Sequence, residues 1–417
     1  MNIGYACLTE GVLNTKLKTC NLKNATPERL KSVIQSNLDS LENMIEYNIK
    51  NRIKLLRISS DIVPFGSHPV NALPWWDIFA DRLKEIGDKA KSNGIRLTMH
   101  PGQYTVLNSP SLDVVERAVK ELQYHARFLD SMNLNSESKM ILHIGGVYGD
   151  KKSAIQRFIK QYRLLDKNIK KRLVIENDDK QYNISDVLSI GESEGIPVVF
   201  DNLHNELNSS DSHSEFEWIS LCKKTWKPKD GNQKIHYSQQ ATNKRNGSHS
   251  ETIDVEKFLN FYKKIPDSNT DIMLEVKDKN LSVVKCVTAI SSPKIGRLEK
   301  EWGRYKYLIL EHSPRIYNEI RQLLKPKEAY PVIEFYKLID EAMRTPITGG
   351  KAVNVAQHIW GYISNLADEK ESKRFEKNLG KVNTGGSTTA VKRTLWKLSI
   401  ERKQEYLLDS LYFMKLY

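Results

Sequence analysis

Short apolar runs rich in β-branched residues alternate with longer amphipathic stretches through residues 1–292 of the 417-residue chain. The stretches between the runs have the 3.6-residue period of helices, and some begin with capping signals such as Thr26-Pro27-Glu28. We expect the runs to form strands at residues 2–6, 53–58, 95–99, 140–144, 173–175, 198–200, 234–237 and 272–276. Eight β/α units in this length predict an α/β fold of the (β/α)8 TIM-barrel type rather than an open doubly wound sheet.

The pattern changes near Lys294, where the β-type runs stop. The remaining segments have helical periodicity and are separated by breakers at Pro326, Pro346 and Gly349-Gly350. We therefore predict two domains: a barrel over residues 1–293 and a smaller all-helical domain over residues 294–417.

Composition narrows the class of protein. With 39% hydrophobic and 28% charged residues, the chain reads as globular and not as a low-complexity sequence. Its four cysteines are widely spaced without a CxxC pair, which argues against a disulfide framework or a thiolate zinc site. The N-terminus lacks the basic and apolar regions of a signal peptide, and no long apolar run follows. We expect a cytoplasmic protein that does not bind membranes.

The chain is basic, and its helical part contributes most to that charge. The formal net charge is +13, and residues 294–417 hold 23 basic against 15 acidic side chains. Such a field attracts a polyanion, and nucleic acid is the obvious candidate. An ordinary solvated surface explains the same surplus equally well.

Chemically active side chains gather where the expected strands end. They are Tyr5, His100, His143, Glu176, Asp201, Lys234, His236 and Glu275, with His68, His204 and His249 in the following loops. Loops after the strands of a (β/α)8 barrel converge on one end of the barrel. Several imidazoles and three carboxylates in one small volume require cations that neutralise the acids and hold the rings neutral. We therefore predict a multinuclear metal site, for which nitrogen and oxygen ligands suit zinc, manganese or iron.

Two chemistries are open to such a site. Two or three ions about 3.5–4 Å apart can support an in-line phosphoryl displacement, so phosphodiester hydrolysis is the leading interpretation. Sugar isomerisation is the other chemistry of a metal-containing barrel. We expect structural roles for His125, on a predicted helix, and for His312 and His358 in the helical part, whereas His213 lies in a polar run.

Seven strings give the barrel part a family resemblance. SSDIVPFGSHP, MHPGQY, HIGGVYG, VIENDD, VFDNLHNELN, KIHYS and MLEVKDK resemble, in order and spacing, motifs of the bacterial UV damage endonucleases. That family consists of metal-dependent barrels related to endonuclease IV. The resemblance implies an endodeoxyribonuclease of DNA repair that acts on damaged double-stranded DNA. It would nick immediately 5′ of cyclobutane dimers and 6-4 photoproducts, and in some members at abasic sites, leaving a 3′-hydroxyl and a 5′-phosphate.

The resemblance also implies roles for individual residues. Two or three divalent ions are implied, with manganese as the expected ion and zinc as the alternative. Glu176 would bridge ions, and His68 would bind metal or the scissile phosphate. The implied metal ligands are His100, His143, Glu176, Asp201, His204, His236, His249 and Glu275.

Lys234 needs a separate argument. An ammonium group beside several divalent cations is strongly repelled, so this lysine should not stay charged. In the family the lysine is carboxylated, which would make Lys234 an anionic ligand with a catalytic role beside Glu176 and His68.

Gln103 and Tyr104 match the family's probe pair, which enters the duplex at the lesion, and Tyr5 matches a position that lines the lesion pocket. A photoproduct stacks and pairs poorly, so a wedge detects it without reading sequence. The loop Cys7–Gly11 lacks an asparagine that some relatives carry, so the resemblance supports no pocket contact from this loop.

The helical part resembles a bacterial domain of unassigned function that is sometimes fused to these enzymes. Its basic residues Lys392, Arg393, Lys397, Arg402 and Lys403 suit phosphate contacts or a solvated helix face. Three alternative functions stay open: an abasic-site endonuclease of the endonuclease IV type, a damage-binding protein whose metals are structural, and a sugar isomerase. We expect a monomer.

Overall fold

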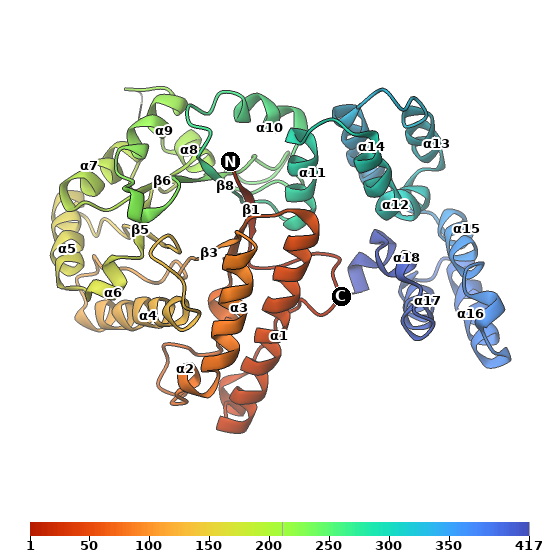
Figure 1. The fold of residues 1–417 in the computed structure, drawn as a ribbon, viewed down its shortest axis with the longest axis horizontal. Helices are drawn as coiled ribbons and strands as arrows, with labels where there is room; N and C mark the ends of the chain where they lie inside the picture. Colours follow the sequence, from red (N-terminus) through yellow and green to blue (C-terminus); the bar gives the residue numbers. More distant parts are fainter. Residues whose placement is uncertain (211, 417) are drawn as a thin grey trace. The chain divides into compact units, whose positions relative to one another are not determined.

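The first compact unit of the computed structural model is a closed barrel of eight parallel strands (Figure 1). The structure describes residues 1–210 and 212–416. Neighbouring strands pair in sequence order, and β1 closes the barrel by pairing with β8. The strands are β1 (Ile3–Ala6), β2 (Leu55–Ile58), β3 (Arg96–Met99), β4 (Met140–His143), β5 (Leu173–Glu176), β6 (Val198–Asp201), β7 (Lys234–Tyr237) and β8 (Asp271–Leu274). The predicted barrel is confirmed, with one strand at each expected run.

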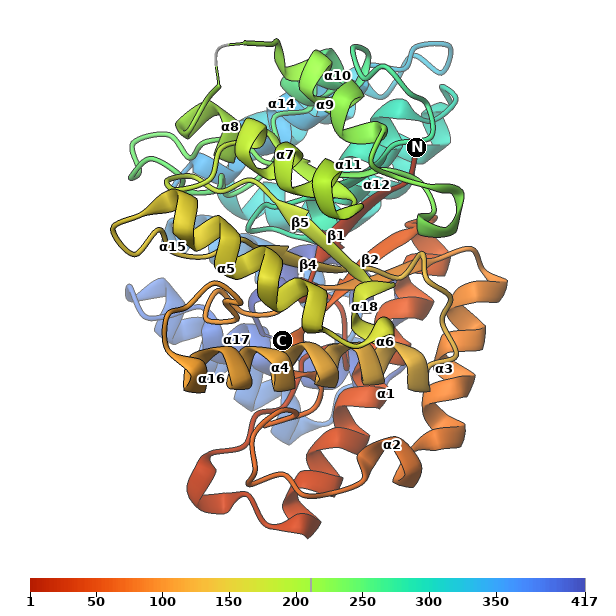
Figure 2. The same ribbon diagram turned by 90° about the vertical axis from the view of Figure 1, so that its left-hand side faces the viewer.

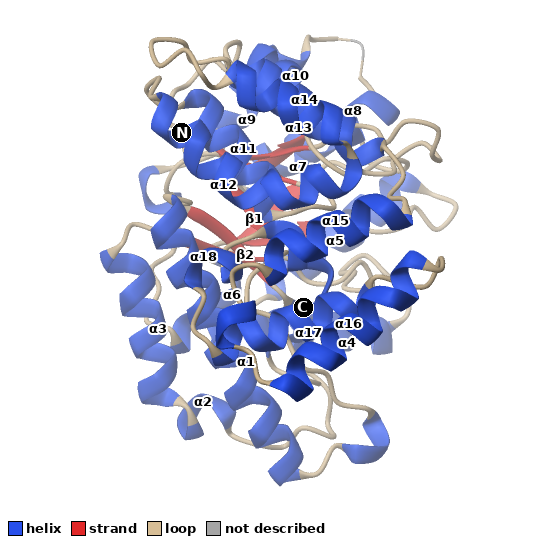
Figure 3. Cartoon of the chain, turned by 90° about the vertical axis from the view of Figure 1, so that its right-hand side faces the viewer, coloured by secondary structure: helices blue, strands red, loops and turns tan. Residues whose placement is uncertain are grey.

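Helices surround the strands of this unit (Figures 2 and 3). The helices are α1 (Pro27–Asn51), α2 (Trp75–Ile78), α3 (Ala80–Ser92), α4 (Leu112–Ser131), α5 (Lys151–Leu164), α6 (Lys167–Lys170), α7 (Ile184–Glu194), α8 (Asn202–Leu207), α9 (Glu215–Lys223), α10 (Val255–Tyr262) and α11 (Asn280–Ile290). Short 3-10 turns occur at Leu22–Asn24, Ser60–Ile62 and Pro228–Asp230. The capping signal at the start of α1 acts as expected, because the Thr26 side chain accepts a hydrogen bond from the Arg29 amide.

Alternate strand residues share a face, which sorts the barrel interior into layers. Two residues before the polar strand ends, the side chains of Ile141, Val174 and Val199 pack together with Trp226. Below them, the Arg96 guanidinium stacks over Trp226 and pairs with Asp271 at 3.0 Å. Side chains therefore fill the interior near the amino ends of the strands, and the polar side chains lie at the carboxyl ends.

The second compact unit comprises residues 10–13, 254–259 and the chain from Thr288. Its regular secondary structure among the described residues is helical, as predicted for the C-terminal part. Its helices are α12 (Ile295–His312), α13 (Pro314–Leu323), α14 (Val332–Arg344), α15 (Gly349–Trp360), α16 (Glu369–Asn383), α17 (Thr389–Glu401) and α18 (Glu405–Leu408), with 3-10 turns at Ser364–Leu366 and Leu411–Leu416. A core that includes Val355, Ile359, Phe375, Val382 and Leu395 holds α15, α16 and α17 together. Across the described ranges, no helix has the length and apolarity needed to cross a membrane.

Candidate metal centre

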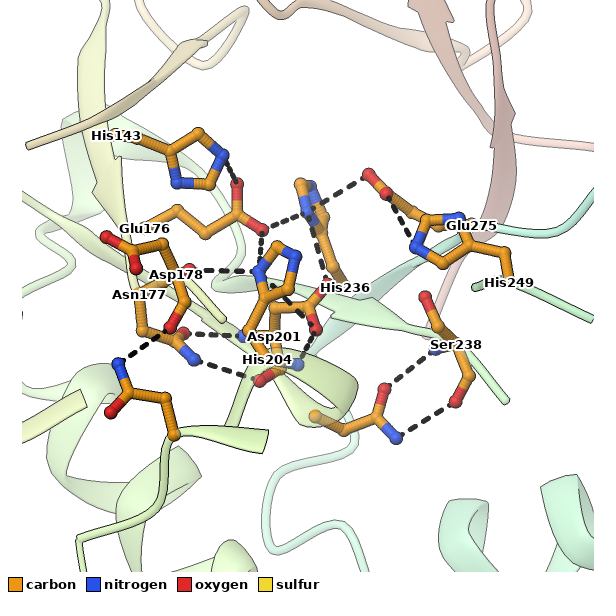
Figure 4. A network of polar contacts seen from close by, with 12 residues as sticks. His143, Glu176, Asn177, Asp178, Asp201, His204, His236, Ser238, His249 and Glu275 are labelled. Atoms are coloured by element: carbon orange, nitrogen blue, oxygen red, sulfur yellow. Dashed lines mark hydrogen bonds and ion pairs between the residues drawn. The ribbon is translucent and has the colours of Figure 1, made fainter. Parts of the chain in front are cut away.

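Glu176 lies at the centre of a polar cluster at the carboxyl ends of the strands (Figure 4). It is the last residue of β5 and is 1% exposed. Its Oε2 lies 3.3 Å from His100 Nε2 and 3.7 Å from His143 Nε2. Its Oε1 forms a 2.7 Å hydrogen bond with His236 Nδ1 and lies 3.7 Å from His204 Nδ1. The two oxygens of one carboxylate therefore face two different pairs of imidazoles.

Asp201 and His204 are brought together by the start of a helix. Asp201 ends β6 and caps α8, and its Oδ1 accepts a 2.8 Å hydrogen bond from the His204 amide. The first turn of α8 places the His204 ring beside the end of β6, where Nδ1 lies 3.7 Å from Asp201 Oδ1. The spacing in the DNLH string is thus the spacing of a helix cap.

Glu275 follows β8 and joins the cluster from the other side (Figure 4). Its Oε1 lies 3.3 Å from His236 Nδ1, and its Oε2 lies 3.8 Å from His249 Nε2. His249 reaches this position through a bridge that pairs its backbone with Gln240. All eight residues expected as ligands are therefore within one connected cluster.

The charges in the cluster set the protonation of its members. Although burial opposes it, the imidazoles of His236, His143 and His100 hold the pKa of Glu176 well below its usual range. Burial outweighs the effect of the nearby Glu176 carboxylate and lowers the pKa of His100 to about 4, so this ring is neutral and can bind a metal ion. Against the effect of burial, the carboxylates of Asp201 and Glu176 raise the pKa of His204 to about 9.

Several side-chain polar atoms of the cluster are buried and lack a hydrogen-bond partner among the described residues. They are Glu176 Oε2, Asp201 Oδ2, His143 Nδ1 and His236 Nε2. Buried polar atoms in native proteins are almost always paired, so unpaired carboxylate and imidazole atoms in one place indicate missing cations. Two groups of three ligands have their donor atoms within 4.8 Å of one another, namely His100, His143 and Glu176, and Glu176, Asp201 and His236. The residues present fit divalent metal ions, and Glu176 belongs to both groups.

Lys234 projects into the barrel from β7, two residues before His236 and on the same face. Its side chain is fully buried, and its Nζ has no hydrogen-bond partner in the described part of the chain. Burial, with the charges of Arg96 and Arg57, holds the pKa of Lys234 well below its usual range, against the effect of Glu176 and Glu275. This shift favours the neutral amine, which is the direction expected from the sequence.

His68 and the predicted probe pair lie in loops. His68 is exposed, its ring packs on Phe65, and its Nδ1 accepts a hydrogen bond from the Val70 amide. Within the described ranges, no hydrogen bond or ion pair joins His68 to the cluster. Gln103 and Tyr104 form the tip of a turn closed by a 2.9 Å hydrogen bond from the Thr105 amide to the Gly102 carbonyl, and Tyr104 is 84% exposed. Their predicted roles in phosphate binding and lesion probing stay predictions.

Tyr5 is placed differently from the expected lesion-pocket residue. It is fully buried, and its hydroxyl donates a 2.9 Å hydrogen bond to Asn48 Oδ1 of α1. In β1 its side chain has the opposite orientation to that of Ala6, because successive strand residues alternate. The ring belongs to the contact between strand and helix, and this geometry gives no support to direct contact with a lesion.

Two residues of the centre were missed by sequence reasoning. Arg57 of β2 donates from Nη1 to Glu275 Oε1 at 2.5 Å and holds the pKa of that carboxyl below its usual range. The only signal was a lone arginine within an apolar run. Asn177 exchanges hydrogen bonds with the Asp201 backbone, and its carbonyl lies 3.0 Å from His204 Nδ1. Its position directly after Glu176 was the available signal.

Two family models together match almost all of the chain. Residues 1–302 match the model described as UV-endonuclease UvdE. Residues 306–416 match a model described as a protein of unknown function, DUF1722.

Individual relatives are similar over long segments. The UV DNA damage endonuclease of Clostridium perfringens (strain 13 / Type A) is 42% identical over 390 residues, covering 90% of this chain and 92% of that protein. The UV DNA damage endonuclease of Bacillus cereus (strain G9842) is 34% identical over 273 residues, covering 65% of this chain and 86% of that protein. The crystal structure of SacUVDE superposes with a TM-score of 0.66 at 42% identity, covering 70% of this chain and 98% of that one. Similarity to the Clostridium protein thus extends beyond the barrel into the helical unit.

Proposed function

Because this chain belongs to the UV-endonuclease UvdE family, we propose that it hydrolyses the DNA backbone immediately 5′ of UV photoproducts in a metal-dependent reaction. Its substrate would be double-stranded DNA that contains cyclobutane dimers or 6-4 products, with abasic sites as further substrates. The products would be a 3′-hydroxyl and a 5′-phosphate, and the enzyme would act as a monomer. The observation that carries the proposal is the set of unpaired carboxylate and imidazole atoms around Glu176.

The ligand geometry supports a centre of two or three ions, with manganese as the expected ion. When bound, such ions polarise the scissile phosphate and lower the pKa of a coordinated water. We assign one ion to the group His100, His143 and Glu176 and another to the group Glu176, Asp201 and His236. The outer ligands His204, His249 and Glu275 complete the set. Arg57 holds one oxygen of Glu275 in place and leaves the other facing His249.

We propose that Lys234 carries a carboxyl group on Nζ. The neutral amine attacks the carbon of carbon dioxide, a nitrogen–carbon bond forms, and a proton leaves the nitrogen, so the product is an anionic carbamate. Complete burial and the absence of a partner for Nζ among the described residues support this modification, since a carbamate brings its own ligand oxygens into the site.

The modification can be tested by intact-mass analysis of protein prepared in isotopically labelled bicarbonate, under neutral conditions that preserve carbamates. The expected result is a label that Lys234→Met removes. Lys285→Met is a matched control, because Lys285 is also buried. Equal labelling of the parent and Lys234→Met would contradict the proposal.

Lesion recognition would depend on the turn that carries Gln103 and Tyr104. Opening a damaged pair costs less than opening intact DNA, so side chains inserted into the duplex select lesions by their weak stacking. The 84% exposure of Tyr104 supports this role, because the ring has no place in the protein core.

A plasmid assay tests the proposed reaction. We expect irradiated supercoiled plasmid to be nicked with manganese, and neither chelated reactions nor unirradiated plasmid to show nicking. Duplexes with one defined dimer or one abasic site then locate the cut and identify the ends. Binding without nicking would favour the damage-binding alternative, and cutting of the abasic duplex alone would favour an abasic-site endonuclease.

A further inference from the structure

Three of the five basic residues first expected to contact phosphate in the helical unit have acidic partners within the protein. Lys392 is half-buried, pairs with Glu311 at 2.6 Å and lies over the Tyr412 ring. Arg402 pairs with Glu371 and donates to the Leu366 carbonyl. Lys397 lies 3.5 Å from Glu401. Arg393 and Lys403 are exposed and form no ion pair with another described residue, so part of the surplus charge stays with them and the rest lies on other helices of the unit.

Helix α16 presents such a surface. Five exposed basic residues, Lys370, Lys373, Arg374, Lys377 and Lys381, recur along its length. At about 100° per residue, the five lie within an arc of about 100° of the helix surface. The acidic residues of the helix, Glu369, Glu371 and Glu376, fall outside that arc. We call these five residues the α16 basic face.

The opposite side of α16 is held in the protein core. Phe375 and Val382 are buried, and the Phe375 ring stacks on Trp360 with centroids 4.3 Å apart. Asn378 donates a 3.0 Å hydrogen bond to Thr394 of α17. Packing on that side turns the α16 basic face outward, and Figure 1 shows the helix beside α15. The helix is therefore a fixed support for its exposed cations.

The charges of the α16 basic face are mostly unneutralised. Lys373 pairs with Glu369 at 2.6 Å. No ion pair joins the side chains of Lys370, Arg374, Lys377 or Lys381 to any other described residue. Four cations held within about 100° of one helix face repel one another, and a line of anions relieves that repulsion.

We propose that the α16 basic face binds the phosphate backbone of duplex DNA outside the lesion. From Lys370 to Lys381 the helix rises about 16 Å, at about 1.5 Å per residue. One DNA strand carries a phosphate about every 3.4 Å along the axis, so the face matches a few consecutive phosphates. A membrane surface fits less well, because the apolar side of α16 is buried in the core and unavailable to lipid. This second binding surface rests on the substrate being DNA, and it is independent of where the nick falls.

Salt dependence of binding tests the proposal on the full chain. The test variant combines Lys370→Gln, Arg374→Gln, Lys377→Gln and Lys381→Gln. The control removes the same number of charges from exposed positions in the helix ends and loops that precede strands β5 and β7. Its substitutions are Lys160→Gln, Lys167→Gln, Lys224→Gln and Lys229→Gln. Affinity for a long intact duplex and for a short lesion-containing duplex is measured across a salt series, and circular dichroism confirms that both variants fold.

Each lost phosphate contact lowers the slope of log affinity against log salt by about 0.9 in magnitude. We expect the test variant to lose about 3 to 4 units of slope on the long duplex, and the control to lose less than about 1. Nicking of the short damaged duplex at saturating DNA should be unchanged in both variants. Equal slopes for test variant and control would overturn the proposal, including the case in which the face binds an acidic protein instead. A parent that does not nick at all would refute the proposed reaction and leave the slope comparison intact.

Discussion

Glu176 concentrates the chemistry of the barrel mouth on one side chain. Its Oε2 faces His100 and His143, and its Oε1 faces His236 and His204. In the proposed centre, a carboxylate shared in this way would fix two ions relative to each other, so its loss should disturb both positions.

Replacing Glu176 with glutamine keeps the shape of the side chain and removes its charge. We expect Glu176→Gln to lose bound manganese and to nick irradiated plasmid more than about 100-fold more slowly, at least the loss typical of removing a group that supports a metal ligand. Elemental analysis after dialysis and the plasmid assay measure the two effects. Glu116→Gln, at an exposed position of α4, is the matched control. Full manganese content in Glu176→Gln would show that the carboxylate is not a ligand.

The gathering of most proposed ligands was predictable from the sequence because they lie at or near a strand end, where barrel topology fixes their destination, whereas His249 comes from the loop after β7. The orientation of Tyr5 and the partner of Arg57 were not predictable. In a four-residue strand, a shift of one position reverses which side chains face inward, and no pattern in such short apolar runs fixes the choice. Only the closed sheet shows that Arg57 meets Glu275.

At the scale of elements, the turn between β3 and α4 carries the proposed lesion probe. The Gly102–Thr105 hydrogen bond holds a tight tip, and packing of the neighbouring Thr105 in the protein leaves Gln103 and Tyr104 outside. A short, closed turn can insert side chains into DNA without a large loss of loop entropy.

Removing both side chains should reduce selection of damaged DNA. We expect Gln103→Ala combined with Tyr104→Ala to lower the ratio of affinities for damaged and intact duplex by about 10- to 100-fold, since a stacked base contributes about 1–3 kcal/mol. Metal content should not change, because no hydrogen bond or ion pair joins Gln103 or Tyr104 to the cluster among the described residues. Tyr406→Ala, at an exposed position of α18, is the control. An unchanged ratio would remove the turn from recognition.

Helices α12 and α17 are joined by an ion pair between the buried Glu311 and the half-buried Lys392. Burial raises the pKa of Glu311 and lowers that of Lys392, so each charge depends on the other. Lys392→Met should cost about 3 kcal/mol of unfolding free energy at pH 7, because Glu311 then stays buried without its partner. Adding Glu311→Gln should recover part of that loss.

The pH dependence of this variant has a definite sign. A carboxyl whose folded pKa is raised contributes stability below its ordinary value of about 4.3 and loses it as pH rises through the raised value. The deficit of Lys392→Met should therefore shrink as pH falls from 7 toward about 5. Hydrogen exchange of peptides from α12 and α17 measures this loss of stability in the two helices. A deficit that grows on acidification would contradict the assigned pairing.

At the scale of the whole molecule, the division into barrel and helical unit was visible in the sequence, because loss of the β-type runs near Lys294 reflects a real change in architecture. The charge distribution was less predictable. Composition counts Lys392 and Arg402 as surface charge, whereas the fold pairs each with an acid brought close by helix packing. Free charge can be assigned only when those long-range neighbours are known.

Metal binding should stabilise the whole barrel. Ions that bind the folded centre and not the unfolded chain add about 2.7 kcal/mol at 100 times the dissociation constant. We expect manganese to raise the melting temperature of the parent and chelator to lower it, with a much smaller shift in Glu176→Gln. Calorimetry measures the melting temperature of the parent with manganese, of the parent with chelator, and of Glu176→Gln with manganese. Equal shifts in melting temperature for parent and variant would mean that the ions bind elsewhere.

Anomalous diffraction from crystals grown with manganese tests the central claim most directly. The account predicts at least two peaks at the barrel mouth, one beside His100 and His143 and one beside Asp201 and His236, with Glu176 between them. A map with no peak among these side chains, from protein saturated with manganese, would contradict it.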